Sequence, residues 1–72
     1  MENWIYKVSY NLWDGKKVEA VVSKDGDNYL ATIRDTKNDK LMCEECREEV
    51  EAIKKAMYYF KEYVYEEIKN KR

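Results

Sequence analysis

The chain contains only two glycines, and each follows an aspartate, in Asp14-Gly15 and Asp25-Gly26. Both pairs lie between segments in which apolar and polar residues alternate. Asp-Gly between such segments favours a β-hairpin, because the turns that match the twist of two antiparallel strands need residues with positive φ. The two pairs therefore predict a three-stranded antiparallel meander, with strands at about residues 4–13, 16–24 and 28–35.

Alternation along these strands separates two faces of the expected sheet, since successive side chains of a strand point to opposite sides. The face expected in the core carries Trp4, Tyr6, Val8, Tyr10, Leu12, Val18, Ala20, Val22, Tyr29, Ala31 and Ile33. The opposite face is only half polar and carries Ile5, Lys7, Trp13, Lys17, Val21, Leu30 and Arg34.

A long helix is predicted after a polar turn at residues 36–40, because residues 43–70 contain no glycine or proline. Glutamates crowd the first turns and cations close the last one, as the helix dipole favours. Apolar residues spaced three and four apart form one stripe that we expect to cover the sheet: Cys43, Cys46, Val50, Ile53, Met57, Phe60 and Val64. The expected fold is α+β, with βββα order, in a single domain of residues 1–72.

The predicted helix also carries aromatic residues beyond this stripe. Ala52, Ala56, Tyr59 and Tyr63 lie on one side of it, and Tyr58 and Tyr65 flank the other. Such a helix is about 40 Å long, whereas a globule of this size is about 30 Å across. We therefore expect the last two turns to overhang the sheet, with Tyr59, Tyr63 and Tyr65 on them.

Composition argues against several activities. The charges are balanced, with Lys+Arg 14 and Asp+Glu 15, so no overall field steers the chain toward polyanions. Histidine is absent, which removes imidazole acid-base and nucleophile systems, and both glycines are used in turns rather than in a phosphate-binding loop. We expect no enzyme, no cofactor and no metal.

Location is also predicted from the sequence. No apolar run is long enough to span a bilayer, and the first residues do not resemble a targeting signal. Two cysteines are too few for a secreted disulfide scaffold, which indicates a reducing compartment. The prediction is a cytoplasmic protein without a membrane partner.

Cys43-Glu44-Glu45-Cys46 is the one motif with the spacing of a site. It offers two ligands where structural zinc takes four, so only a dimer sharing both cysteines could complete a metal site. The two glutamates would raise a thiol pKa, which disfavours redox chemistry. The preferred interpretation is a pair of buried structural thiols, and the shared metal stays as the alternative.

The tyrosines favour a protein interface, because Tyr and Trp bury much area at low entropic cost and still satisfy a polar tip. The interface candidates are Tyr58, Tyr59, Tyr63, Tyr65 and Trp13. The predicted function is stoichiometric docking on a larger protein, in the manner of an anti-CRISPR-like inhibitor that a phage or mobile element directs against host defence. Homodimerisation through the Tyr59 and Tyr63 side of the C-terminal helix is a separate hypothesis.

A DNA-binding role is the alternative. In architecture alone, three strands backed by one helix resemble the arm-binding domains of phage integrases, which lay a sheet in the major groove. That resemblance implies contacts from Lys7, Trp13, Lys17 and Arg34 on the outer sheet face. The balanced charge argues against it, since readers of duplex DNA carry an excess of cations.

Overall fold

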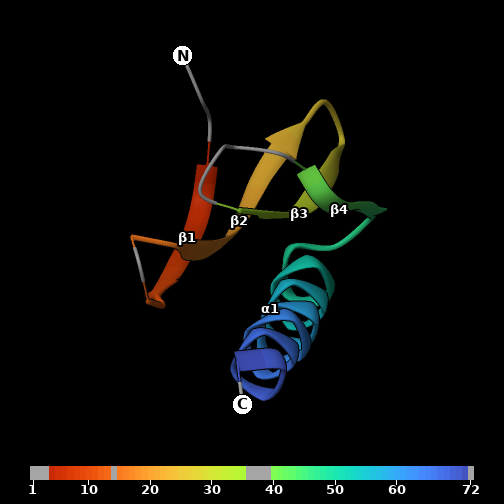
Figure 1. Ribbon diagram of the computed structural model, residues 1–72. Helices are drawn as coiled ribbons and strands as arrows, with labels where there is room; N and C mark the ends of the chain where they lie inside the picture. The colour runs from red at the N-terminus through yellow and green to blue at the C-terminus, as the bar shows by residue number, and fades with distance from the viewer. Residues whose placement is uncertain (1–3, 14, 36–39, 72) are drawn as a thin grey trace.

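A sheet backed by one C-terminal helix forms the molecule. The computed structural model describes residues 4–13, 15–35 and 40–71. In these ranges the elements are β1 (Trp4–Asn11), β2 (Lys17–Asp25), β3 (Asn28–Arg34), β4 (Lys40–Cys46) and α1 (Glu49–Lys71). The strands are antiparallel in the order β1-β2-β3-β4, and α1 packs on one face of the sheet, against β2, β3 and β4 (Figure 1). The α+β class and the sheet-plus-helix arrangement are confirmed.

The predicted βββα order is wrong, because a fourth strand stands between the meander and the helix. Residues Lys40–Cys46 pair with β3, and α1 begins only at Glu49. The first backbone bond of the helix runs from the Ala52 N–H to the Glu48 carbonyl, at 3.0 Å. Of the predicted polar turn, residues 36–39 lie outside the described ranges, and Lys40 belongs to β4.

The fourth strand completes the backbone pairing of β3, which lies in the interior of the sheet. Ala31, Thr32 and Ile33 are buried, although their side chains alternate between the two faces. A strand buried on both faces must also pair both of its edges, since unpaired backbone groups are costly away from water. β4 supplies that second partner despite its two glutamates, which are poor strand formers.

Both glycines have the positive φ that the hairpins require. Gly26 has φ 63°, and with Asp27 it forms the two-residue loop between the paired residues Asp25 and Asn28. Gly15 has φ 72°. The first turn is closed by the Lys16 N–H, which donates to the Trp13 carbonyl at 3.0 Å, while Asp14 lies outside the described residues.

Each edge strand contains a β-bulge that exposes an apolar residue. In β1 the register shifts between Trp4 and Tyr6, and in β4 the residue without a partner opposite is Leu41. The β1 bulge moves Trp4 out of the predicted core face: its side chain is 52% exposed, and the Lys7 Nζ lies 5.8 Å from its ring centroid. Tyr6 and Val8 do pack against the core, as alternation predicted.

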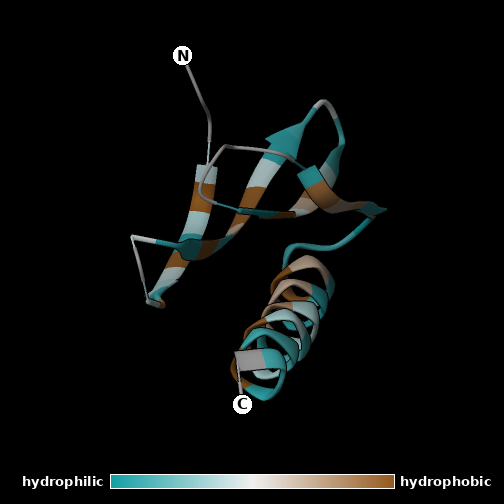
Figure 2. Cartoon of the chain, viewed as in Figure 1, coloured by the Kyte–Doolittle hydropathy of each residue, from teal (hydrophilic) through white to brown (hydrophobic). Residues whose placement is uncertain are grey.

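The core lies between the sheet and α1. Hydrophobic and hydrophilic bands follow one another along β1 and β2 in Figure 2, although β2 carries three apolar residues in succession, Ala20, Val21 and Val22. On the helix side, Ala52 and Ala56 have no exposed surface, and their small side chains let the helix approach the sheet closely. The buried apolar cluster consists of Val18, Ala20, Val22, Ala31, Ile33, Cys46, Ala52, Ala56, Phe60 and Val64.

The predicted core stripe is therefore only partly correct. Phe60 and Val64 are in the core, but Val50 is 62% exposed and Cys43 lies on β4 rather than on the helix. The prediction placed Ala52 and Ala56 beside the stripe, whereas they face the sheet directly. The helix face that packs on the sheet is therefore centred on these small residues.

The predicted overhang is wrong for two of its three tyrosines. Tyr59 and Tyr63 pack against the core, and the Tyr63 hydroxyl donates to the Leu41 carbonyl at 3.3 Å. The last turns are also held by Glu67, whose Oε2 lies 2.8 Å from the Lys16 Nζ at the β1–β2 turn. Tyr65 alone remains largely exposed, at 62%.

Candidate protein-binding site

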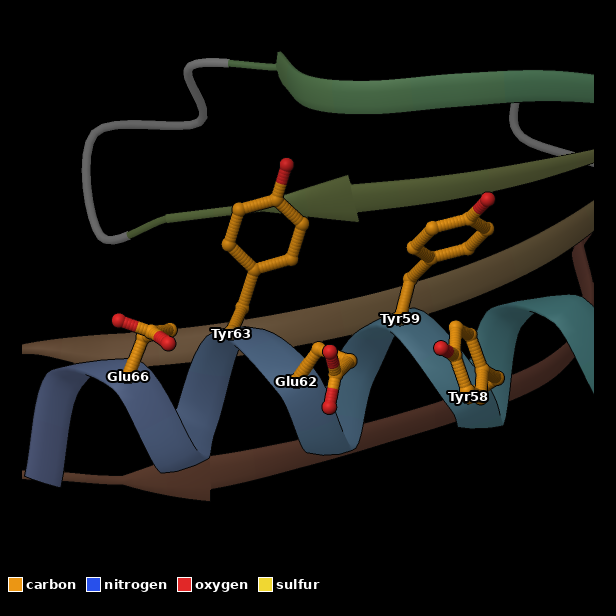
Figure 3. Close-up of a pocket in the computed structure, with 5 residues that line it drawn as sticks. All are labelled: Tyr58, Tyr59, Glu62, Tyr63 and Glu66. Atoms are coloured by element: carbon orange, nitrogen blue, oxygen red, sulfur yellow. The ribbon is translucent and has the colours of Figure 1, made fainter. Parts of the chain in front are cut away.

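A shallow groove of about 320 Å³ runs along α1 on the side of the helix nearest β4. We call it the tyrosine groove, and it is lined by Tyr58, Tyr59, Glu62, Tyr63 and Glu66 (Figure 3). Helical spacing explains the set, because residues three and four apart stand on one face of a helix. Tyr58, Glu62 and Glu66 form one such row, and Tyr59 and Tyr63 form the next.

The tyrosines of the groove differ in how firmly they are held. Tyr59 and Tyr63 are half-buried and point from α1 toward the sheet (Figure 3), where Tyr63 bonds the Leu41 carbonyl. Tyr58 is 61% exposed. Its ring stands edge-on to that of Tyr59, with centroids 5.2 Å apart and planes at 80°, a favourable aromatic geometry. The groove thus has a fixed aromatic wall and one exposed ring.

The charged lining of the groove is acidic. Glu62 and Glu66 are exposed, and no lysine or arginine lines the groove in the part of the chain that the structure describes. Within the described ranges neither carboxylate takes part in a salt bridge. Carboxylates beside aromatic faces attract cationic groups, through charge and through the ring quadrupole. The groove therefore suits a ligand that is apolar with positive charge.

The structure brings three of the five predicted interface residues together. Tyr58, Tyr59 and Tyr63 line the groove, whereas Tyr65 lies outside it on α1. Trp13 is half-buried after β1 and does not line the groove. Sequence reasoning missed Glu62 and Glu66, although their i+4 and i+8 spacing from Tyr58 was a usable signal.

Three of the four residues of the DNA-binding alternative share a surface, and Trp13 lies beyond the end of β1. Lys7, Lys17 and Arg34 lie on the sheet face opposite α1, which their pairing registers define. Glu19 lies among them, opposite Arg34, and its side chain carboxylate is 3.3 Å from the Lys7 Nζ. The cations of this face therefore partly neutralise a carboxylate of their own sheet.

The two cysteines are free thiols on opposite faces of β4. Residues three apart in a strand point to opposite sides, unlike the shared helix stripe that was predicted. Cys46 is buried, and its burial raises the pKa of its thiol above the ordinary value, 9.0. Cys43 is exposed and its sulfur accepts a bond from Thr32 Oγ1 at 3.6 Å.

No group of three or more His, Cys, Asp or Glu side chains arranged to hold a metal occurs in residues 4–13, 15–35 and 40–71. In the same ranges, no helix has both the length and the apolar character that crossing a bilayer demands.

Comparison with known proteins finds no matching family model, no similar curated protein and no matching solved structure.

Proposed function

We propose that this protein is a non-enzymatic binding module that acts by stoichiometric docking on a larger protein. The observation that carries the proposal is the tyrosine groove, with Tyr58 exposed over a wall of half-buried tyrosines. Tyrosine is enriched in binding hot spots, because it contributes large contact area with little rotamer entropy to lose. A groove lined in this way offers an anchor site and a polar rim.

Further apolar residues are exposed outside the groove. Leu41 on β4 is 40% exposed and bonds through its carbonyl to Tyr63, so it lies at the β4 side of the groove. Val50, Tyr65 and Ile68 are exposed on α1 itself.

The finer form of the proposal is an inhibitor that a phage or mobile element directs at a host defence protein in the cytoplasm. What supports it is the absence of histidine from the sequence and the surplus aromatic surface. A protein of this kind needs only a surface that blocks its target, because it performs no reaction.

Tyr58→Ala tests the docking site, and Tyr65→Ala is its matched control, since the two rings are 61% and 62% exposed on the same helix. We expect Tyr58→Ala to weaken co-purification of a partner from host cells by about 30-fold or more, as loss of a hot-spot ring does. Quantitative mass spectrometry of the captured material measures the effect, and circular dichroism checks folding. Equal retention by both variants would contradict docking at the groove.

Duplex DNA binding through the outer sheet face is the second candidate, favoured by the shared placement of Lys7, Lys17 and Arg34. It predicts retardation of duplex DNA in a gel at low salt, with affinity falling steeply as salt rises. Lys17→Ala should then reduce binding, whereas Tyr58→Ala should leave it unchanged. Absence of retardation would remove this candidate.

Homodimerisation through α1 is a further proposal, but its surface must differ from the one expected. Tyr59 and Tyr63 are half-buried against the sheet, so the exposed rings available to a second copy are Tyr58 and Tyr65. Light scattering at high concentration measures the mass. A monomer mass there would refute dimerisation.

A further inference from the structure

We propose that the tyrosine groove and the outer edge of β4 together bind an extended, basic segment of the partner protein, which adds to the sheet as a fifth strand. This inference rests on the proposed docking function and names the occupant of its site. It has three supports on the molecule: an open strand edge, an adjoining groove and local acidity.

The open edge is that of β4. This strand is last in the order β1-β2-β3-β4, and in the described part of the chain it pairs only with β3. Half of the backbone N–H and C=O groups of an edge strand point away from the sheet, and they form a template for an added strand. The bulge at Leu41 interrupts this template, so the regular stretch is residues 42–46.

The groove adjoins that edge because two contacts tie β4 to α1. The Tyr63 hydroxyl bonds the Leu41 carbonyl at 3.3 Å, and the Lys55 Nζ lies 2.7 Å from the Glu44 carboxylate. In Figure 3, Tyr59 and Tyr63 point from the helix toward the strands. A strand added to β4 would direct every second side chain toward α1, which is where the tyrosine rings lie.

The charge of this region selects a basic occupant. Glu62 and Glu66 line the groove without a salt bridge among the described residues, and β4 contributes Glu44 and Glu45. Lys55 bonds Glu44, and Asn28 donates to Glu45 at 2.9 Å, which leaves the two groove carboxylates for the occupant. Lysine or arginine on the added strand would contact these carboxylates and the exposed ring of Tyr58.

A second copy of the chain fits this edge poorly. Symmetric antiparallel pairing of two β4 strands over their regular stretch would bring Glu44 and Glu45 of one copy near the same glutamates of the other, and like charges across a strand pair are destabilising. Nucleic acid is disfavoured for the same reason, because its phosphates would face the acidic groove. The observations therefore point to a basic polypeptide.

The probe is a capped synthetic peptide of alternating lysine and valine residues, about nine long, with a glutamate-valine peptide as its matched control. Binding to the whole ¹⁵N-labelled protein is followed by NMR. We expect the basic peptide to shift the amides of residues 42–46 and the tyrosine groove, and the acidic peptide to shift neither. Two further peptides carry N-methyl groups on alternate residues, in one or the other register.

In an added strand, only every second N–H group points toward β4 and bonds to it, while the others point away. Methylation of the bonding N–H groups should therefore weaken binding at least tenfold, whereas methylation of the others should leave it about the same as for the parent peptide. Glu62→Gln with Glu66→Gln should weaken binding about three- to tenfold. The control pair, Glu49→Gln with Glu51→Gln, removes the same charge from the first turn of the helix and should change it less than about twofold.

Several outcomes would overturn the inference: no binding at millimolar peptide, equal binding of the acidic peptide, equal binding of both methylated peptides, or shifts confined to other surfaces. Self-association that displaces the peptide would assign the edge to a second copy instead. The capture experiment with Tyr58→Ala and Tyr65→Ala distinguishes failure of the strand-addition inference from failure of the proposed docking function. If capture depends on Tyr58 while the peptide leaves β4 unchanged, docking stands and strand addition fails.

Discussion

Ala56→Leu tests which face of α1 packs on the sheet. Ala56 has no exposed surface and belongs to the buried cluster between the helix and the sheet. Leucine adds three carbon atoms at a position that has no free space between the helix and the sheet. The helix must then move away from the sheet, or neighbouring side chains must leave their preferred rotamers.

The cost follows from the general behaviour of overpacked cores. Extra methylene groups in a packed core destabilise by about 1–3 kcal/mol. For a domain of this size, each kcal/mol lowers the melting temperature by about 4–8 °C. We therefore expect Ala56→Leu to lower the melting temperature by roughly 5–20 °C, because alanine and leucine differ little in helix propensity. Thermal unfolding followed by far-UV circular dichroism, which reports the helix content, measures the melting temperature.

Val50→Leu is the matched control, because Val50 is 62% exposed on the same helix. Its free energy of unfolding should change by less than about 0.5 kcal/mol. The stripe predicted from the sequence places Val50 in the core and Ala56 at its side. It therefore predicts that Val50→Leu destabilises the protein and that Ala56→Leu has little effect. A stable Ala56→Leu together with a destabilised Val50→Leu would refute the helix orientation described above.

Three further predictions concern the turns, the helix anchor and the buried thiol. Gly26→Ala should lower the free energy of unfolding by about 1–2 kcal/mol in urea titration, from backbone strain alone, since a Cβ there meets no atom within 4 Å. A double-mutant cycle of Lys16→Met and Glu67→Gln should give a coupling of about 0.2–1 kcal/mol, because the pair is partly exposed; no coupling would exclude this anchor. Burial raises the pKa of Cys46, so its contribution to stability is complete below the unfolded pKa, near 9.0, and is lost as pH rises toward the folded pKa. Between about pH 8 and about pH 10, urea titrations should show a smaller loss of unfolding free energy in Cys46→Ala than in the parent. Equal losses would contradict the assignment of this pH dependence to the buried Cys46 thiol.

Local sequence signals predicted the parts of the fold that depend on neighbouring residues. The meander was predictable because Gly15 and Gly26 follow alternating strands, and both have positive φ in the structure. Tyr6 and Val8 were correctly assigned to the core face by alternation alone. Trp4 was not, because the bulge that reverses its face depends on how β1 pairs with Ser23 and Val22 of β2.

The candidate site was predictable in part. The tyrosines were identified from their helical spacing, and Tyr58, Tyr59 and Tyr63 do line one groove. Its acidic lining was missed, because exposed glutamates on a helix look the same in sequence whether or not they adjoin a groove. The open edge beside it could not be seen either, since the sequence predicts residues 43–46 of β4 as the start of the helix and Lys40 as part of a turn.

The amino-acid sequence alone determined the hairpins, the long helix and the α+β class, because turn chemistry and side-chain periodicity act over a few residues. Tertiary structure decided that Lys40–Cys46 is a strand and that Ala52 and Ala56 face the sheet. The reason is that β3 is buried on both faces and must pair both of its edges, so it recruits a segment whose own propensity is weak. The helix packs on this sheet through the face that carries Ala52 and Ala56, and Tyr59 and Tyr63 beside that face form the wall of the groove.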